Sequence, residues 1–420
     1  MAGATSVPER GTGDASGIGP EAARFARFAA EHAGDWDRRG EVPDDVRRAL
    51  AATGLLGADV PAGYGGLGGS QADLGELCAR IGGACSALRG LVTVQSMVAA
   101  ALSRWGTEAQ RTRWLPDLAA GRTIAGFAAT EPGAGTDLAA VSTRIEEDGD
   151  WVRVTGTKRW VTFGRTADVF LVLGTSAGRP TTVLVDGALP GVSREPVEGQ
   201  LGMRAAEIAH LRLDDVRVPR GNVVAPVGLG LSHVVATALD HGRFTVAWGC
   251  VGMAESCLDA AAAHVVRRTQ GGIALAEHQL VRAQLARAAV ESAAARELCA
   301  HATRLRTRRA PEAVAATITA KYAAARAAGS VSRAAVQLLG AAGCEPDSAV
   351  GRFSRDAQVM EIIEGSAHVA ELHIADRLLR RHGFRPGASA ATPSPTATPG
   401  PTATSAPAPA PAREFEETAP

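Results

Sequence analysis

The sequence predicts an α+β protein built from an N-terminal α-helical domain, a middle antiparallel β domain and a C-terminal four-helix bundle. The prediction comes from the spacing of apolar residues. They recur with the helical period over residues 20–125, with a period of two over 126–228, and with the helical period again over 229–385. Because the period changes twice, we expect three consecutive domains with these boundaries.

The sequence predicts several helices in the N-terminal domain, because glycine and proline interrupt the helical spacing at 40–43, 61–69 and 106. Outside the three domains, residues 1–19 and the Pro-, Ala- and Thr-rich residues 386–420 have low complexity. Such segments bury too little apolar surface to offset their ordering entropy, so we predict that both are disordered.

In the middle domain, short apolar or alternating runs are separated by turn residues, which favours an antiparallel sheet. These runs lie at 151–155, 169–173, 182–185 and 210–213. In the last domain the helical spacing is long and the links are short, which predicts an antiparallel bundle. Its expected helices cover roughly 231–267, 277–307, 311–340 and 356–382.

Composition excludes several function classes. The 44 basic and 44 acidic side chains balance, so no nucleic-acid partner is indicated. The six cysteines form no Cys-x-x-Cys pair and the histidines show no paired ligand spacing, so we predict neither a metal site nor a disulfide framework. The sequence shows neither a signal-peptide apolar run nor 18 consecutive apolar residues, and we expect a cytoplasmic protein without a membrane span.

The segment RDAQVMEIIEG places Glu364 where a helix meets a loop, after two isoleucines and before Gly365. Apolar surroundings raise the proton affinity of a carboxylate, which suits removal of a proton next to a carbonyl. Taken alone, the same letters also describe an exposed glutamate before a helix-capping glycine. The interpretation of Glu364 as a catalytic base therefore depends on the other motifs.

Two motifs in the β domain suit a flavin. FAATEPGAGTD, residues 127–137, offers the hydroxyls of Thr130 and Thr136 and bare backbone amides around Gly135, which can bind the polar edge of a flavin ring and a pyrophosphate. GTKRWVTFG, residues 156–164, offers the flat ring of Trp160 and the hydroxyl of Thr162. Because these two residues are two apart on a strand, we expect both on one side of the sheet.

Together with the order of the domains, these motifs resemble the acyl-CoA dehydrogenase family over about residues 21–382. The resemblance implies FAD as the cofactor, Glu364 as the catalytic base, and a homodimer or homotetramer. It implies that the flavin contacts are Phe127, Ala129, Thr130, Gly135, Thr136, Trp160, Thr162 and Ser366.

In this family a second subunit completes the FAD site, and the matching positions here are Arg268, Gln337 and Gly340. The family's phenylalanine after the arginine is replaced by Gly271, and Ala341 stands where a second glycine is usual. The resemblance places Thr136, Asp240 and Arg243 near the substrate.

A narrower resemblance involves CSALRGLVTVQSMVAAAL, TVAWGCVGM and MEIIEGS. These segments are similar to the acyl-CoA dehydrogenase homologues that make methoxymalonyl-acyl carrier protein for polyketides. The resemblance implies oxidation of a glyceryl-derived three-carbon acyl group on an acyl carrier protein, with an unknown electron acceptor. The alternatives are a short-chain acyl-CoA dehydrogenase with a CoA thioester substrate, aminomalonyl-carrier protein formation, a flavin monooxygenase on the same fold, and an inactive scaffold.

Overall fold

The structure is a computed structural model that describes residues 17–384. The chain divides into two compact units after Ala375. Of the second unit, the structure describes residues 376–384, which include the last residues of a helix that ends at Arg380. The predicted disordered segments lie outside the described residues, except that the first helix already begins at Ile18.

The N-terminal part is helical, as predicted. Its helices are α1 (Ile18–Arg39), α2 (Asp44–Ala52), α3 (Gln71–Gly82), α4 (Ser86–Trp105) and α5 (Glu108–Ala119). Capping boxes at Ser70 and Thr107 satisfy the free amides that begin α3 and α5. α4 is long and apolar enough to cross a membrane, yet 89% of that stretch is buried inside the protein, so α4 is a core helix.

The middle part is a sheet. Its strands are β1 (Ala125–Ala128), β2 (Arg144–Asp148), β3 (Trp151–Val161), β4 (Val169–Ser176), β5 (Arg179–Asp186), β6 (Val192–Pro196), β7 (Ala209–Pro219) and β8 (Val223–Val224). They run in the order β6-β7-β3-β2-β4-β5-β8, with β1 beside β4. The sheet is mainly antiparallel, as predicted, and departs from that pattern where β1 and β2 each pair with β4 in parallel.

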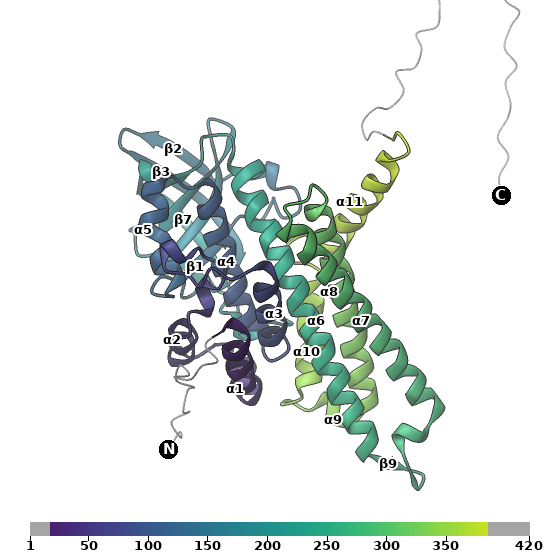
Figure 1. Cartoon of the computed structure of the whole chain (residues 1–420). Coiled ribbons are helices and arrows are strands. Elements are labelled where there is room, and N and C mark those ends of the chain that lie inside the picture. The colour runs from purple at the N-terminus through teal and green to yellow at the C-terminus, as the bar shows by residue number, and fades with distance from the viewer. Residues whose placement is uncertain (1–16, 385–420) are drawn as a thin grey trace, which may run out of the picture. The chain divides into compact units, whose positions relative to one another are not determined.

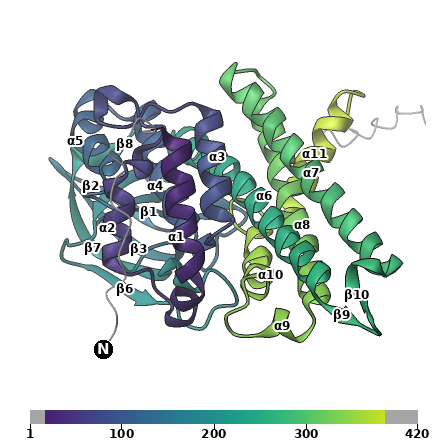
Figure 2. The ribbon, with the colours of Figure 1, turned by 60° about the horizontal axis from the view of Figure 1, so that its bottom comes forward.

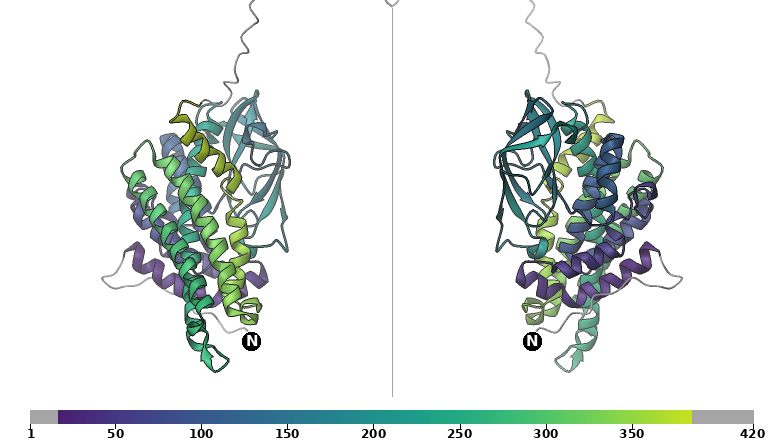
Figure 3. Two further views of the ribbon diagram at one scale, coloured as in Figure 1. Left: turned by 90° about the vertical axis from the view of Figure 1, so that its right-hand side faces the viewer. Right: turned by 90° about the vertical axis from the view of Figure 1, so that its left-hand side faces the viewer.

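The C-terminal part is a helical bundle. It contains a π-helical turn at Gly230–Val235, α6 (Ala236–Arg267), α7 (Gln279–Thr307), α8 (Ala313–Leu339), α9 (Ala341–Cys344), α10 (Ala349–Met360) and α11 (Ala367–Arg380). A small hairpin of β9 (Thr269–Gln270) and β10 (Ile273–Ala274) joins α6 to α7. Figure 1 and Figure 3 show α6, α7 and α8 running side by side.

The predicted single helix over 356–382 is wrong, since α10 ends at Met360 and α11 begins at Ala367. The chain between them bends at Glu364 and Gly365, whose φ angles are 55° and 99°. A residue with positive φ cannot continue a right-handed helix, so the bend separates the two helices.

Candidate active site

The bend that carries Glu364 is fixed by two cations from other helices. Arg243 on α6 donates from Nε to the carbonyl of Glu364 at 2.8 Å. Lys321 on α8 donates from Nζ to the carbonyl of Gly365, also at 2.8 Å. The left-handed conformation of a non-glycine residue is strained, and these two contacts provide binding energy that keeps it in place.

One oxygen of the Glu364 carboxylate accepts no hydrogen bond from the described residues. This oxygen, Oε2, is buried. It lies against Gly242 on α6, since a Cβ built on Gly242 would be 2.7 Å from Oε2, and the sulfur of Met97 on α4 is 2.8 Å from the same Cβ position. Burial raises the pKa of Glu364 to about 7, although Arg243, Lys321 and Arg89 act in the opposite direction. A carboxylate with this pKa and an unpartnered oxygen can accept a proton at neutral pH.

A second buried charged group, Arg89 on α4, packs against α6 two turns beyond Gly242. Arg89 is 2% exposed, and a Cβ on Gly249 of α6 would lie 2.7 Å from its Cδ. Among the described residues its guanidinium contacts the hydroxyl of Thr93 at 3.1 Å and the sulfur of Met360 at 3.0 Å, and it has no carboxylate partner. Gly242 and Gly249 are seven positions apart, which is about 10 Å along α6, and the Glu364 carboxylate and the Arg89 Cδ lie against these two glycines.

The first flavin motif is held by a buried ion pair. Lys158 on β3 donates from Nζ to Glu131 Oε1 at 2.7 Å and to the carbonyl of Ala129 at 3.2 Å. Glu131 also accepts from the backbone and hydroxyl groups of Ser142 and Thr143. Burial alone would raise the pKa of Glu131, yet these hydrogen bonds lower it to about 2, so the pair is charged at neutral pH.

The two predicted flavin motifs meet in space. Arg159 N donates to the carbonyl of Thr130 at 2.8 Å, which joins the loop after β1 to the end of β3. Beyond Thr130, the loop presents an open face, because no atom lies within 4 Å of the position a Cβ would take on Gly135. Thr136 is exposed on the same loop, whereas Ala129 is buried and Phe127 is half-buried.

Trp160 is presented to solvent by a bulge. Lys158 pairs with Leu211 and Val161 with Ala209, so two β3 residues stand opposite the single residue His210. Trp160 has a φ of 59° and a side chain that is 57% exposed. His210 supports it, accepting from Trp160 N at 3.2 Å with its ring edge-on to the indole at 5.4 Å.

The reason given for placing Trp160 and Thr162 together is therefore wrong. Alternation along a regular strand does not apply across the bulge, and Thr162 follows the end of β3. Thr162 instead approaches α4, where its Cγ2 lies 3.7 Å from the Cβ position of Gly90. α4 thus approaches Thr162 of the second flavin motif at Gly90, and two turns further along the helix its Met97 borders the same Cβ position of Gly242 as the Glu364 carboxylate.

The residues present fit an FAD ring. A bound flavin and its substrate would use the exposed indole of Trp160, the exposed hydroxyl and amide groups around Gly135, and the Glu364 carboxylate with its unpartnered Oε2. Trp160 would lie against the ring, and Thr130, Gly135 and Thr136 would hold its polar edge.

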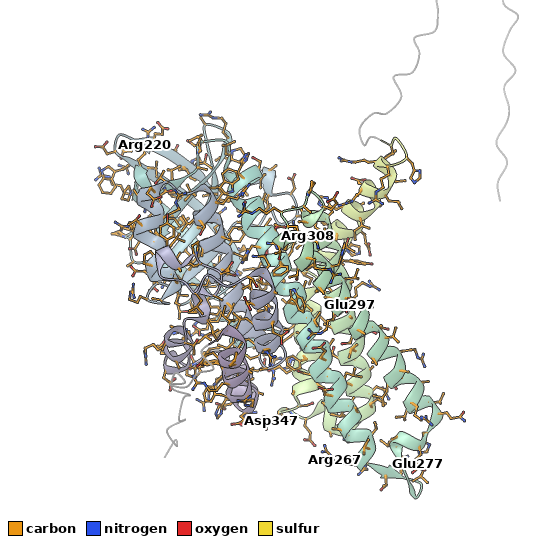
Figure 4. All side chains as sticks on the ribbon, viewed as in Figure 1. Arg220, Arg267, Glu277, Glu297, Arg308 and Asp347 are labelled. Carbon is orange, nitrogen blue, oxygen red and sulfur yellow. The ribbon has the colours of Figure 1, made fainter. Side chains whose placement is uncertain are left out.

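The residues expected to serve a second subunit lie elsewhere in the chain. Arg268 caps α6 beside the β9–β10 hairpin, and Gln337 and Gly340 end α8; all three are exposed. Figure 1 and Figure 2 show the hairpin at the end of the bundle away from β1 and β3. Figure 4 likewise shows Arg267, which precedes Arg268, far from Arg220, which directly follows β7. The structure therefore does not bring Arg268 to the flavin motifs of its own chain.

Two other predicted site residues have local partners. One oxygen of the Asp240 carboxylate accepts from Arg306 on α7, and the other is buried without a hydrogen-bond partner in the described part of the chain. Ser366 lies at the start of α11, where its hydroxyl accepts from Val369 N at 3.4 Å. Neither contact involves Glu364.

Sequence reasoning missed several residues that the structure brings to the site. Gly242, Met97, Arg89, Lys321 and the Lys158–Glu131 pair were not named as site residues. Two signals were present in the sequence. Lysine occurs only at 158 and 321, and Arg89 lies within the CSALRG segment that carried the narrower resemblance.

Comparison with known proteins agrees with this arrangement. Models of the acyl-CoA dehydrogenase N-terminal, middle and C-terminal domains match residues 18–122, 126–216 and 230–379. The chain belongs to the acyl-CoA dehydrogenase family. It is 32% identical to glutaryl-CoA dehydrogenase of Desulfococcus multivorans, over 82% of this chain and 90% of the relative.

Among solved structures of acyl-CoA dehydrogenase relatives, the chain is similar to FkbI, which serves biosynthesis of the methoxymalonyl extender unit of the polyketide FK520. The TM-score is 0.81 at 39% identity, covering 86% of this chain and 99% of FkbI. A glutaryl-CoA dehydrogenase from Mycobacterium smegmatis in complex with FADH2 aligns with a TM-score of 0.81 at 27% identity, covering 87% and 95%. The chain is thus a flavoprotein oxidoreductase that uses FAD, of a family whose typical substrates are acyl thioesters.

Proposed function

We propose that this acyl-CoA dehydrogenase oxidises a glyceryl-derived three-carbon acyl group on an acyl carrier protein, toward the hydroxymalonyl group that becomes a methoxymalonyl extender unit. Its likeness to FkbI, at 39% identity over 86% of the chain, supports this substrate class. The cysteines of the described residues are unpaired, which supports a cytoplasmic location.

The structural observation that carries the proposal is the unpaired guanidinium of Arg89. Burying a cation without an anionic partner is costly, and thioether and hydroxyl contacts compensate only weakly. A substrate oxygen about 10 Å or less from the base would offset that cost. An alkyl chain would leave the guanidinium unsatisfied, so the interior favours a short acyl group that ends in a carboxylate or hydroxyl over a butyryl chain.

The residues of the chain then have distinct roles. The C3 hydroxyl is first oxidised to an aldehyde by a separate 3-hydroxyacyl dehydrogenase, and water adds to give the aldehyde hydrate. Glu364 would take the proton released as this hydrate loses two electrons, and Arg89 would bind the oxygens of the carboxylate that forms at C3. Arg243 holds the bend of Glu364 through its carbonyl. Bound FAD supplies the two-electron acceptor. Thr130, Gly135, Thr136, Trp160 and Thr162 hold the cofactor, and Arg268 and Gln337 complete the site of a neighbouring subunit in a homodimer or homotetramer.

The experiment follows flavin bleaching without oxygen. The holoenzyme is offered a glyceryl-derived or a seryl-derived thioester on a carrier protein, each together with a 3-hydroxyacyl dehydrogenase that oxidises the C3 hydroxyl, and butyryl-CoA in parallel. We expect bleaching by the carrier-bound group. Bleaching by butyryl-CoA alone would contradict the proposal and leave a short-chain acyl-CoA dehydrogenase, and bleaching only by a seryl-derived thioester would indicate aminomalonyl formation.

Arg89→Met tests the structural observation directly. We expect it to lower kcat/KM for the carrier-bound polar group by roughly 10²-fold or more, the effect of losing a charge-assisted contact to the substrate. Arg104→Met is the matched control, because Arg104 lies on the same helix and is exposed. Equal activity of wild type and Arg89→Met would remove Arg89 from substrate recognition.

A further inference from the structure

Lysine is almost absent from this chain. Arginine supplies 42 of the 44 basic side chains, and the two lysines are Lys158 and Lys321. Both are buried, at 0% and 2% exposure. An ammonium is compact and its charge responds to burial, whereas a guanidinium is larger and stays charged. The two lysines therefore stand where a small buried cation is accommodated, and only Lys158 has a carboxylate partner among the described residues.

The environment of Lys321 is the Glu364 bend. Its Nζ donates to the carbonyl of Gly365, next in the chain to the carbonyl that Arg243 holds. Lys321, Arg243, Glu364 and Gly365 line one small cavity, of about 10 Å³. Neither cation donates to the carboxylate, whose Oε2 has no partner among the described residues. Two cations are thus kept close to the carboxylate by bonds to backbone carbonyls instead.

We propose that Lys321 is a positioning residue for the base: its ammonium fixes the carbonyl of the bend and supplies a positive charge beside the Glu364 carboxylate without pairing with it. A direct ion pair would occupy the oxygen that must accept a proton. The bond from Lys321 to a backbone carbonyl avoids this. The ammonium charge then favours the ionised form of Glu364 through space, while the lone pairs of the carboxylate stay free. The proposal rests on the proposed role of Glu364 as the base.

Several other groups contribute to the charge at the bend. Burial lowers the pKa of Lys321 to about 8, so its charge is present where the carboxylate titrates. The remaining titratable or charged groups that face Glu364 or Lys321 are Arg89 on α4, Arg243 and Cys250 on α6, Glu361 after α10, and His373 on α11. The test must therefore change Lys321 alone and leave these groups in place.

Two substitutions separate charge from hydrogen bonding. Lys321→Met removes both the charge and the contact to Gly365, whereas Lys321→Gln removes the charge and keeps a donor that can reach a carbonyl. Lys321→Arg retains a charge. Arg326→Met is the matched control, because Arg326 is an exposed cation on the same helix.

The first readout needs no substrate. Difference infrared spectra of each holoenzyme against the same enzyme carrying Glu364→Gln report protonation of the Glu364 carboxyl as a function of pH. We expect the midpoint to rise by about one pH unit in both neutral variants, because a nearby positive charge favours the ionised form. Lys321→Arg should lie nearer wild type, and Arg326→Met should equal it. An unchanged midpoint in folded Lys321→Gln would overturn the proposal.

The second readout is the pH dependence of flavin reduction by substrate. The rising limb of kcat/KM should move to higher pH in Lys321→Gln, in step with the infrared midpoint. A shifted midpoint with an unshifted limb would show that Glu364 is not the base, while the effect of Lys321 on the carboxyl would stand. A uniform loss of activity at every pH, with no movement of either curve, would reduce Lys321 to a structural residue.

Discussion

The carboxylate of Glu364 occupies the space that a side chain at position 242 would fill. A Cβ on Gly242 would be 2.7 Å from Oε2 and 2.8 Å from Cδ of Glu364. Such distances do not occur between real atoms, so glycine at this point of α6 is what admits the base. The relationship joins Gly242 to a bend that lies 122 residues further along the chain.

Gly242→Ala should therefore displace the base without unfolding the protein, since the carboxylate ends a flexible side chain. A shift of about 1 Å in a catalytic group costs roughly 10²-fold in rate. We expect flavin reduction to slow by about that factor while FAD content stays the same, as measured by anaerobic stopped flow. Gly221→Ala is the control, because no atom lies within 4 Å of its Cβ position. Normal rates in Gly242→Ala would mean that the carboxylate need not occupy this place.

Glu364→Gln should slow reduction of the bound flavin by roughly 10²- to 10⁴-fold, because it keeps the shape of the side chain and removes its basic oxygen. The absorbance spectrum of bound FAD should be unchanged. Near-normal reduction would assign the base to another group or favour oxygen chemistry on this fold.

The order of the domains and the two flavin motifs could be predicted from the sequence because both depend on local patterns. The bend at Glu364 could not be predicted in the same way, since the apolar period continues through it and one positive φ leaves no mark on that period. The contacts that hold the bend come from Arg243 and Lys321, 121 and 44 residues away. The bulge at Trp160 could not be predicted from local patterns either, because it depends on the register of β3 against β7.

Arg268→Ala should weaken FAD binding without changing the fold. Loss of one charge-assisted contact to a pyrophosphate is expected to raise the dissociation constant by roughly 10- to 10²-fold. Equilibrium dialysis and sedimentation would measure cofactor affinity and oligomeric state together. Arg267→Ala is the control, because this exposed neighbour precedes Arg268 at the end of α6. A monomer that binds FAD stoichiometrically would contradict the shared site.

The Lys158–Glu131 pair should show strong coupling. Lys158→Met leaves a buried carboxylate without its cation, and breaking a buried pair in this way costs about 3–5 kcal/mol. Changing both residues, as Lys158→Met with Glu131→Leu, should lose less stability than the sum of the single changes, because no unpaired charge remains. Urea unfolding of the four proteins gives the coupling energy, and additive losses would mean that the 2.7 Å contact carries little of the stability of the loop.

The pH dependence of stability provides an independent measure of the burial of Glu364. Burial raises its pKa from 4.5 to about 7 in the folded protein. The protonated form is the favoured one in the interior, so its contribution is fully present below pH 4.5 and is lost as the pH rises through 7. The loss is on the order of 3 kcal/mol for a shift of this size. Glutamine does not titrate, so the free energy of unfolding of Glu364→Gln, relative to wild type, should increase between about pH 5 and pH 8. Urea unfolding of both holoenzymes across this interval measures the difference. If the two proteins lose or gain stability in parallel, the carboxylate is better solvated than its unpartnered Oε2 implies, and the base would have an ordinary proton affinity.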